Sequence, residues 1–207
     1  MKEIFRHVKL FLLFAVLIFT GLIDAQNTKQ QYQTYVSKVY NFSFAYPPSF
    51  TLKEYYPESV SISESKDFWV DAEVIDVETW YREKLEFEPG KKIEADKIKA
   101  AALDHAILSN SADGPDGSFY SNNPKIELDY FSNNRLRTIR FYLDGIYENY
   151  EAGTKTVNPI GPFYGIDIST GKKLTVLVIF FRSESLANQA QQIIIKNIAD
   201  SVKLTGK

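Results

Sequence analysis

The segment Leu174–Phe181, LTVLVIFF, constrains the fold more than any other part of the sequence. Successive side chains of a β-strand point to opposite faces of the sheet, and here both alternating sets of positions are dominated by apolar residues. Such a strand needs further layers that cover both faces of its sheet. We therefore predict a central strand over residues 173–181, inside a domain with several layers.

The segment Tyr40–Tyr46 shows the other strand pattern, in which aromatic residues alternate with Asn, Ser and Ala. This period of two predicts a strand with one packed face and one more polar face. Pro47 and Pro48 follow directly. They end the strand because proline has no backbone N–H to donate to a neighbouring strand.

The remaining elements are predicted from the same kinds of periodicity. Residues 90–109 and 184–199 carry apolar residues at helical spacing, and Ser183 stands where it would cap the second helix. Residues 110–123 contain several Gly, Pro, Asn and Asp, and they are predicted to form a loop. Further strands are predicted at residues 59–63, 68–77, 125–131, 137–147, 161–169 and 202–204.

The order of these elements predicts the fold class. Four strands follow one another after Asn123, whereas a parallel sheet requires a helix after nearly every strand. Runs of strands with one helix in the middle of the chain and one near its end favour an α+β fold, an antiparallel sheet with helices on both faces. The chain of 207 residues, 44% of them apolar, suffices for one sizeable core.

The first 25 residues have the features of a secretory signal peptide. A basic start precedes the apolar run Leu10–Ile23, and Ala25 is a small residue at which a signal peptidase cuts. The run is shorter than the roughly 20 apolar residues of a membrane-spanning helix, so we expect no permanent membrane anchor, with an uncleaved signal anchor as the alternative. The expected location is extracytoplasmic, either periplasmic or secreted. Residues 1–25 are thus the predicted signal, 26–38 a polar linker and 39–205 a single domain.

The segment YNFSFAYPPSFTL, Tyr40–Leu52, resembles the first strand of PsbP-like domains, whose pattern is GFSFxYPxxW. The order of the later elements is also similar, so the resemblance covers roughly Tyr35 to Leu204. It implies an α/β/α sandwich with an antiparallel sheet and an exported accessory or envelope protein, and it implies little about activity. Two positions depart from the family pattern, because Asn41 replaces its glycine and Phe50 its tryptophan.

His105 is the only histidine that remains after removal of the signal, so any serine-histidine catalysis would pass through it. It is either a general base oriented by the preceding Asp104 or a histidine packed where a helix meets the sheet. No Gly-x-Ser-x-Gly motif or other nucleophile signature accompanies it. We favour the packed histidine and predict no catalytic residues. The chain has no cysteine, which excludes disulfides and thiol catalysis.

Two groups of carboxylates invite other interpretations. The first group could supply oxygen ligands to Ca²⁺, but its spacing differs from that of calcium-binding loops, and Asp-Gly turns explain it. We predict no metal site there. Its members are Asp113, Asp116, Glu127 and Asp129.

The second group lies on a predicted strand and suggests a glycosidase, in which one carboxyl group is protonated and the other ionised. Along a strand Asp71 and Glu73 share one face while Asp76 and Glu78 take the other, so at most one pair faces any cleft. Charges on a solvated strand edge explain these residues equally well.

Several tyrosines exceed what the core needs, and exposed tyrosine is common in binding surfaces because it is rigid and amphipathic. The alternative is that tyrosine simply suits half-buried strands. The predicted binding residues are Tyr142, Tyr147, Tyr150, Tyr55 and Tyr56.

The sequence therefore predicts an exported, non-enzymatic binding or accessory protein of the cell envelope. Its partner would be another envelope or extracellular protein. We expect no nucleic acid, because no run of Lys or Arg forms a basic stripe and the net charge is −2. No Gly-rich phosphate loop is present, and we expect no cofactor. A small extracytoplasmic hydrolase and a carrier of an apolar ligand are the alternatives.

Overall fold

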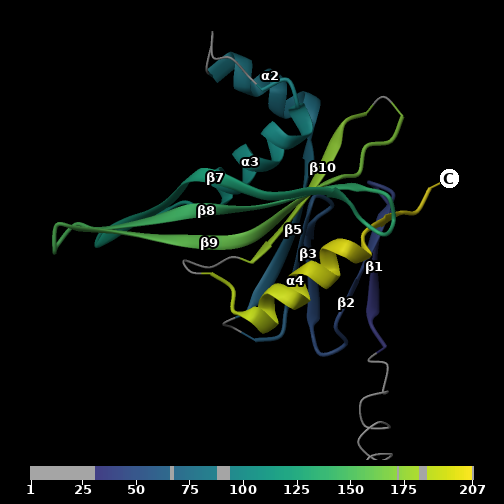
Figure 1. Ribbon diagram of the computed structural model, residues 1–207, viewed down its shortest axis with the longest axis horizontal. Helices are drawn as coiled ribbons and strands as arrows, with labels where there is room; N and C mark the ends of the chain where they lie inside the picture. Colours follow the sequence, from purple (N-terminus) through teal and green to yellow (C-terminus); the bar gives the residue numbers. More distant parts are fainter. Residues whose placement is uncertain (1–30, 66–67, 88–93, 172, 182–185, 207) are drawn as a thin grey trace, which may run out of the picture. The chain divides into compact units, whose positions relative to one another are not determined.

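The structure is a computed structural model that describes residues 31–65, 68–87, 94–171, 173–181 and 186–206 (Figure 1). The predicted signal peptide and the cap at Ser183 lie outside these ranges. Residues Tyr32–Lys207 form one compact unit. None of the helices in the described ranges is long and apolar enough to cross a membrane.

An antiparallel sheet of eight strands organises this unit. The strands lie in the order β3-β4-β5-β10-β9-β8-β7-β6, and every neighbouring pair is antiparallel. This confirms the predicted antiparallel α+β class. The strands are β3 (Thr51–Tyr56), β4 (Ser59–Ser63), β5 (Trp69–Asp76), β6 (Ala112–Gly114), β7 (Gly117–Phe131), β8 (Arg137–Asn149), β9 (Thr154–Asp167) and β10 (Thr175–Phe181).

The strand β10 is central, as predicted from its apolar residues. All seven of its residues are buried, and it pairs with β5 on one side and β9 on the other. Leu177, Ile179 and Phe181 enter the hydrophobic cluster on one face, whereas Val176 and Phe180 enter the cluster on the other. Both sets of side chains are thus used, which explains why the segment is apolar throughout.

A second, three-stranded sheet was not predicted. It consists of β1 (Gln33–Ser37), β2 (Phe42–Tyr46) and β11 (Lys203–Leu204), with β2 in the middle. The prediction of a linker over residues 26–38 is therefore wrong for β1, which pairs with β2 along its whole length. The side chain of Tyr35 holds β1 in the folded domain, because its ring packs against that of Phe44 with 5.1 Å between the ring centroids.

The turn between β1 and β2 explains one departure from the PsbP-like pattern. Asn41 has a φ of 53°, in the left-handed region that glycine adopts freely. Asparagine tolerates this backbone conformation better than most other residues. Asn41 therefore replaces glycine at a position where the turn demands this conformation.

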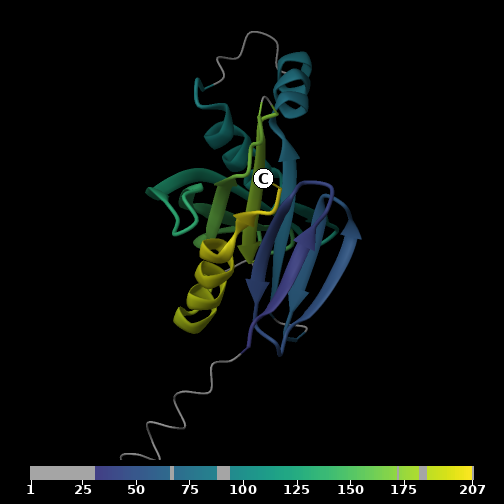
Figure 2. The same cartoon turned by 90° about the vertical axis from the view of Figure 1, so that its right-hand side faces the viewer.

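Helices cover both faces of the large sheet, as predicted (Figures 1 and 2). Helix α4 (Gln189–Ser201) shares one face with the small sheet, and α3 (Lys97–Ser109) packs on the other. Helix α2 (Val77–Phe87) was not predicted. It follows β5 directly, and the Asp76 carboxylate accepts hydrogen bonds from its first backbone N–H groups.

Both predicted helices begin later than their periodicity indicated. Asp96 caps α3 by accepting a hydrogen bond from the Lys99 backbone N–H. Asn188 caps α4 in a capping box with Gln191, in which each side chain bonds the other residue's backbone. Polar capping residues, and not the first apolar residue, thus mark the two helix starts.

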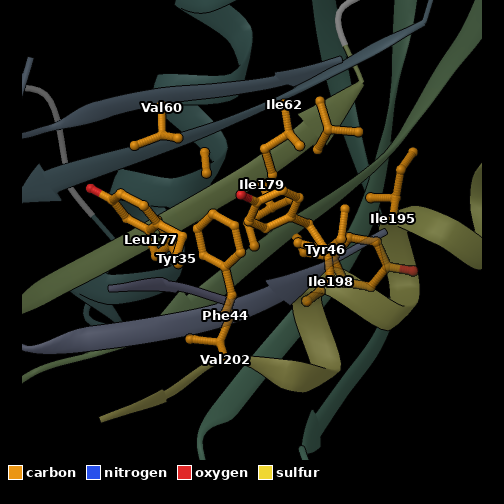
Figure 3. Close-up of a cluster of buried hydrophobic side chains, with 14 of the residues drawn as sticks. Tyr35, Phe44, Tyr46, Val60, Ile62, Leu177, Ile179, Ile195, Ile198 and Val202 are labelled. Carbon is orange, nitrogen blue, oxygen red and sulfur yellow. The ribbon is translucent and has the colours of Figure 1, made fainter. Parts of the chain in front are cut away.

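Two hydrophobic clusters lie on opposite faces of the large sheet. The first joins the small sheet and α4 to one face and is rich in aromatic residues, and Figure 3 shows part of it. The second joins α2 and α3 to the other face and contains Ala101, Ala102 and Ala106. The buried side chain of Phe50, which stands at the family's tryptophan position, belongs to the first cluster.

The prediction of a loop over residues 110–123 is wrong. These residues include β6 and the first part of β7, which pairs with β8 from Gly117 to Asn122. Strand β9 likewise begins at Thr154, ahead of its predicted start. Within β7, the segment Asn122–Pro124 coincides with an irregularity in the pairing between Asn122 and Lys125.

Candidate functional site

A groove lies on β3, β4 and β5, on the face of the large sheet opposite the small sheet. Its volume is about 670 Å³. We call it the serine groove. Its lining consists of Tyr55, Tyr56, Ser59, Ser61, Ser63, Ser65, Trp69, Asp71 and Glu73.

The sequence of β4, Ser-Val-Ser-Ile-Ser, creates the floor of the serine groove. Val60 and Ile62 point into the first hydrophobic cluster, so the three serines point to the opposite face. Serine is small, while the neighbouring strands carry larger side chains on this face. The floor is therefore low and carries hydroxyl groups.

Cross-strand pairing arranges the walls of the serine groove in rows. Ser59 lies between Tyr56 and Glu73, and Ser61 lies between Lys53 and Asp71. In the third row, Ser63 pairs with Trp69 on β5. The two tyrosines thus lie near one end of the floor and the tryptophan near the other.

Asp71 and Glu73 share the groove face, as their spacing predicted, whereas Asp76 caps α2. The interpretation as solvated strand-edge charges is wrong for both groove carboxylates, because β5 lies between β4 and β10 inside the sheet. Asp71 is buried, at 7% exposure. The two carboxylates therefore lie on an interior strand of the sheet and line the groove.

His105 contacts Glu73 and not Asp104. Its Nε2 lies 2.5 Å from a Glu73 carboxylate oxygen and 3.1 Å from the Ser109 hydroxyl. Asp104 instead accepts hydrogen bonds from the Trp80 indole and the Lys84 ammonium. His105 is thus at the boundary between α3 and the sheet, which agrees with the packed histidine that the sequence favoured.

The geometry at His105 differs from a catalytic triad. In a triad one ring nitrogen faces the nucleophile and the other faces the orienting carboxylate. Here Ser109 and Glu73 both contact Nε2. Glu73 therefore contacts the same ring nitrogen that would have to accept the Ser109 proton, and this arrangement does not activate Ser109.

The carboxylates of the first group do not converge on one site. Asp113 accepts a hydrogen bond from the Tyr150 hydroxyl, while Glu127 and Asp129 form ion pairs with Arg140 and Arg137. Within the described ranges, no group of three or more His, Cys, Asp or Glu residues is placed to hold a metal ion. Asp116 lies in the turn between β6 and β7.

The five predicted tyrosines fall into two places. Tyr55 and Tyr56 line the serine groove, while Tyr142, Tyr147 and Tyr150 lie on β8 or just after it. Their role in binding stays a prediction. The groove's serines and Trp69 were missed, although the alternation of serine with Val and Ile in residues 59–63 marks a polar strand face.

Of the second group, Tyr147 lies in a projecting part of the sheet and Tyr150 directly follows it, whereas Tyr142 lies outside that part. Strands β7, β8 and β9 run together beyond the other strands (Figure 1), because β10 pairs with β9 only at residues 163–167. We call residues 117–123, 144–149 and 154–160 the β-arm. Tyr120, Ile146 and Val157 lie directly opposite one another across its three strands.

Charged pairs flank this apolar row of the β-arm. On the tip side, Lys155 donates hydrogen bonds to Glu148 and to the Tyr120 hydroxyl, at 2.9 and 2.8 Å. On the body side, Lys125 donates to Asp144 at 2.7 Å. The arrangement is an apolar centre with a charged rim, as in many protein interfaces.

Comparison with known proteins gives structural similarity only. No protein-family model and no curated protein matches the sequence. The structure is similar to that of the Ran-binding protein Mog1p of Saccharomyces cerevisiae, with a TM-score of 0.46, 7% identity, and coverage of 86% of this chain and 97% of that chain. It is similar to cyanobacterial PsbP from Synechocystis sp. PCC 6803, with a TM-score of 0.39, 9% identity, and coverage of 86% and 95%.

A third similar structure, of a protein from Bacteroides thetaiotaomicron VPI-5482, has a TM-score of 0.31 and 9% identity. This chain spans 50% of that protein. A PsbP structure is thus among the similar structures. We transfer no site, partner or activity from these proteins to this chain.

Proposed function

We propose that this chain is an exported, non-enzymatic binding protein of the cell envelope or extracellular space, and that another protein docks on its β-arm. The row of Tyr120, Ile146 and Val157 carries the proposal, because it places an apolar stripe on a part of the sheet that extends past the body. Val157 is 54% exposed. The signal peptide predicted over residues 1–25 supports export.

The chemistry of the β-arm favours a protein as the occupant. Its surface is a ribbon of three strands, which presents side chains and backbone and suits a broad contact. Both signs of charge flank the apolar row, in the pairs formed by Lys155 and by Lys125. A partner with a small apolar patch and mixed charges around it would complement this surface.

Neither alternative function has comparable support. The hydrolase would need a base at His105, whose Nε2 is shared between Ser109 and Glu73. The carrier would need space between helix and sheet. At Gly165, an added Cβ would approach the Ala102 Cβ to 2.7 Å, so α3 lies directly on β9.

A photocrosslinking experiment in the native host tests the proposal. A photoreactive amino acid replaces Tyr150 of the full chain, and as a control replaces Phe87 on α2, which is even more exposed. We expect the chain outside the cytoplasm, beginning near Gln26, and one discrete adduct from the Tyr150 position alone. The partner is identified by mass spectrometry, purified, and titrated against the unlabelled protein.

A substitution in the apolar row makes this test specific. Val157→Glu places a charge in the centre of the row, and we expect it to weaken binding of the purified partner about tenfold or more. Leu108→Glu, at an exposed position on α3, serves as the control. Equal adducts from both probe positions, or equal affinity of the Val157→Glu variant, would contradict the proposal.

A further inference from the structure

The floor of the serine groove presents hydroxyl groups that have no protein partner. In the part of the chain that the structure describes, the hydroxyls of Ser59, Ser61 and Ser63 make no hydrogen bond with another residue. Each serine is partly exposed. A hydroxyl both donates and accepts, so three in a row can pair with a ligand that alternates donors and acceptors.

Aromatic side chains stand at both ends of this floor. Tyr56 pairs with Ser59 and Trp69 pairs with Ser63, four residues further along β4. At about 3.3 Å per residue, the two rows are about 13 Å apart along the strand. Tyr56 is 70% exposed, so its ring is free to stack on a ligand.

The charges along the walls disfavour a cationic ligand. Asp71 and Glu73 line one wall, but Lys53 lies across Ser61 from Asp71, with its ammonium 4.4 Å from the centre of the Tyr55 ring. Glu73 is already engaged by His105. A ligand with many positive charges would therefore meet Lys53 and gain little from Glu73.

We propose that the serine groove binds a neutral oligosaccharide. The apolar faces of its pyranose rings would stack on Tyr56 and Trp69, and its hydroxyls would bond the serine hydroxyls and the Asp71 carboxylate. Aromatic surfaces combined with a few polar groups are the usual composition of small-molecule sites. This site is separate from the β-arm, so it goes beyond the docking of a protein there.

The spacing of the two rings specifies the length of the ligand. A single pyranose ring is too short to contact rings in rows about 13 Å apart, whereas several linked rings span that distance. The groove is therefore expected to prefer an oligosaccharide over its monosaccharide.

Calorimetric titration of the purified protein tests this proposal with cellotetraose, maltotetraose and chitotetraose, each against its monosaccharide, and with tetralysine. We expect saturable binding of at least one tetrasaccharide, weaker binding of its monosaccharide, and little effect of added salt, because the ligand is uncharged. Tyr56→Ala and Trp69→Ala should each weaken binding about tenfold or more.

Tyr150→Ala is the matched control, since that tyrosine is also exposed but lies beyond β8 near the β-arm. It should leave saccharide binding unchanged, and an unchanged melting temperature of Tyr56→Ala shows that its fold is intact. The proposal is overturned if none of the three tetrasaccharides binds, or if Tyr56→Ala binds as well as the parent. It is also overturned if tetralysine binds more tightly and loses affinity with salt, which would assign the groove to basic peptides.

Discussion

The two faces of the large sheet are covered in different ways. One face is closed by the small sheet and α4, and the cluster between them contains the aromatic residues Phe42, Phe44 and Tyr46. The other face is covered only in part, by α2 and α3, and α3 contributes alanines. The aromatic cluster under the small sheet supplies much of the core, and the other face leaves the serine groove open.

The elements that cover the two faces contribute side chains of different size. Two sheets that pack face to face lie about 10 Å apart, and aromatic rings fill the space between them. Helix α3 packs on β9 at Gly165, which has no side chain, so that the Ala102 Cβ lies directly over the strand. On this face α3 contributes small alanines, while the sheet beneath it contributes the stacked rings of Phe141, Phe163 and Phe180.

Removing an aromatic ring from the closed face should have the largest effect. Phe44→Ala is expected to lower the free energy of unfolding by about 3–5 kcal/mol, because Phe44 is 1% exposed and its ring lies against Tyr35. Val36→Ala, in the same small sheet but 49% exposed, is the control and should change stability by less than about 0.5 kcal/mol. Urea unfolding measures both. A loss for Phe44→Ala as small as that for Val36→Ala would show that the small sheet contributes little to the core.

Adding a methyl group to the partly covered face should have an intermediate effect. Gly165→Ala is expected to cost about 1–3 kcal/mol, because its Cβ would lie 2.7 Å from that of Ala102. Gly114→Ala, where the closest atom would be 3.7 Å away, is the control. In a double-mutant cycle with Ala102→Gly, we expect a coupling energy between the two sites. Additive effects of the two substitutions would mean that the methyl group added at position 165 does not contact residue 102.

The smallest effect concerns the ion pairs that hold α3 on the sheet. Arg137 donates hydrogen bonds to Asp129 and forms an ion pair with Asp96, the cap of α3. These hydrogen bonds from Arg137 lower the pKa of both carboxyl groups. Because the pKa is lower in the folded state, the stabilisation is present above the ordinary aspartate pKa of about 3.9 and is lost as the pH falls through the lower folded value.

Arg137→Gln should therefore cost about 1 kcal/mol at neutral pH, since the three groups are partly exposed, and progressively less below about pH 4. Urea unfolding of the variant and its parent over this pH range measures the difference. Lys125→Gln, which removes the more exposed pair with Asp144, is the control and should cost less. A difference that stays constant with pH would show that Arg137 acts through packing and not through its ion pairs.

Much of the fold was predictable because it depends on local patterns. The apolar segment of β10, the aromatic alternation of β2 and the stop at Pro47 are properties of a few consecutive residues. The helix starts were predicted less well. Each depends on one polar side chain, Asp96 or Asn188, that bonds the backbone three residues later, and such a cap is weaker than the periodicity that surrounds it.

The candidate sites were predictable only in part. Tyr55 and Tyr56 were identified as exposed tyrosines, but their neighbour Trp69 and the serine floor were not. The contact between Glu73 and His105 joins residues 32 positions apart. A neighbouring carboxylate in the sequence, Asp104, was the obvious partner, yet successive residues of a helix point in different directions.

The sequence by itself determined several of the strands, which one is central and that the sheet is antiparallel, because the alternation of residues along a strand reports which of its faces are buried. Only the tertiary structure decided that β1 and β2 form a separate sheet, that the β-arm extends past β10, and that a row of serines has an aromatic side chain near each end. These features depend on which distant strands pair and in what register, and a local pattern specifies neither.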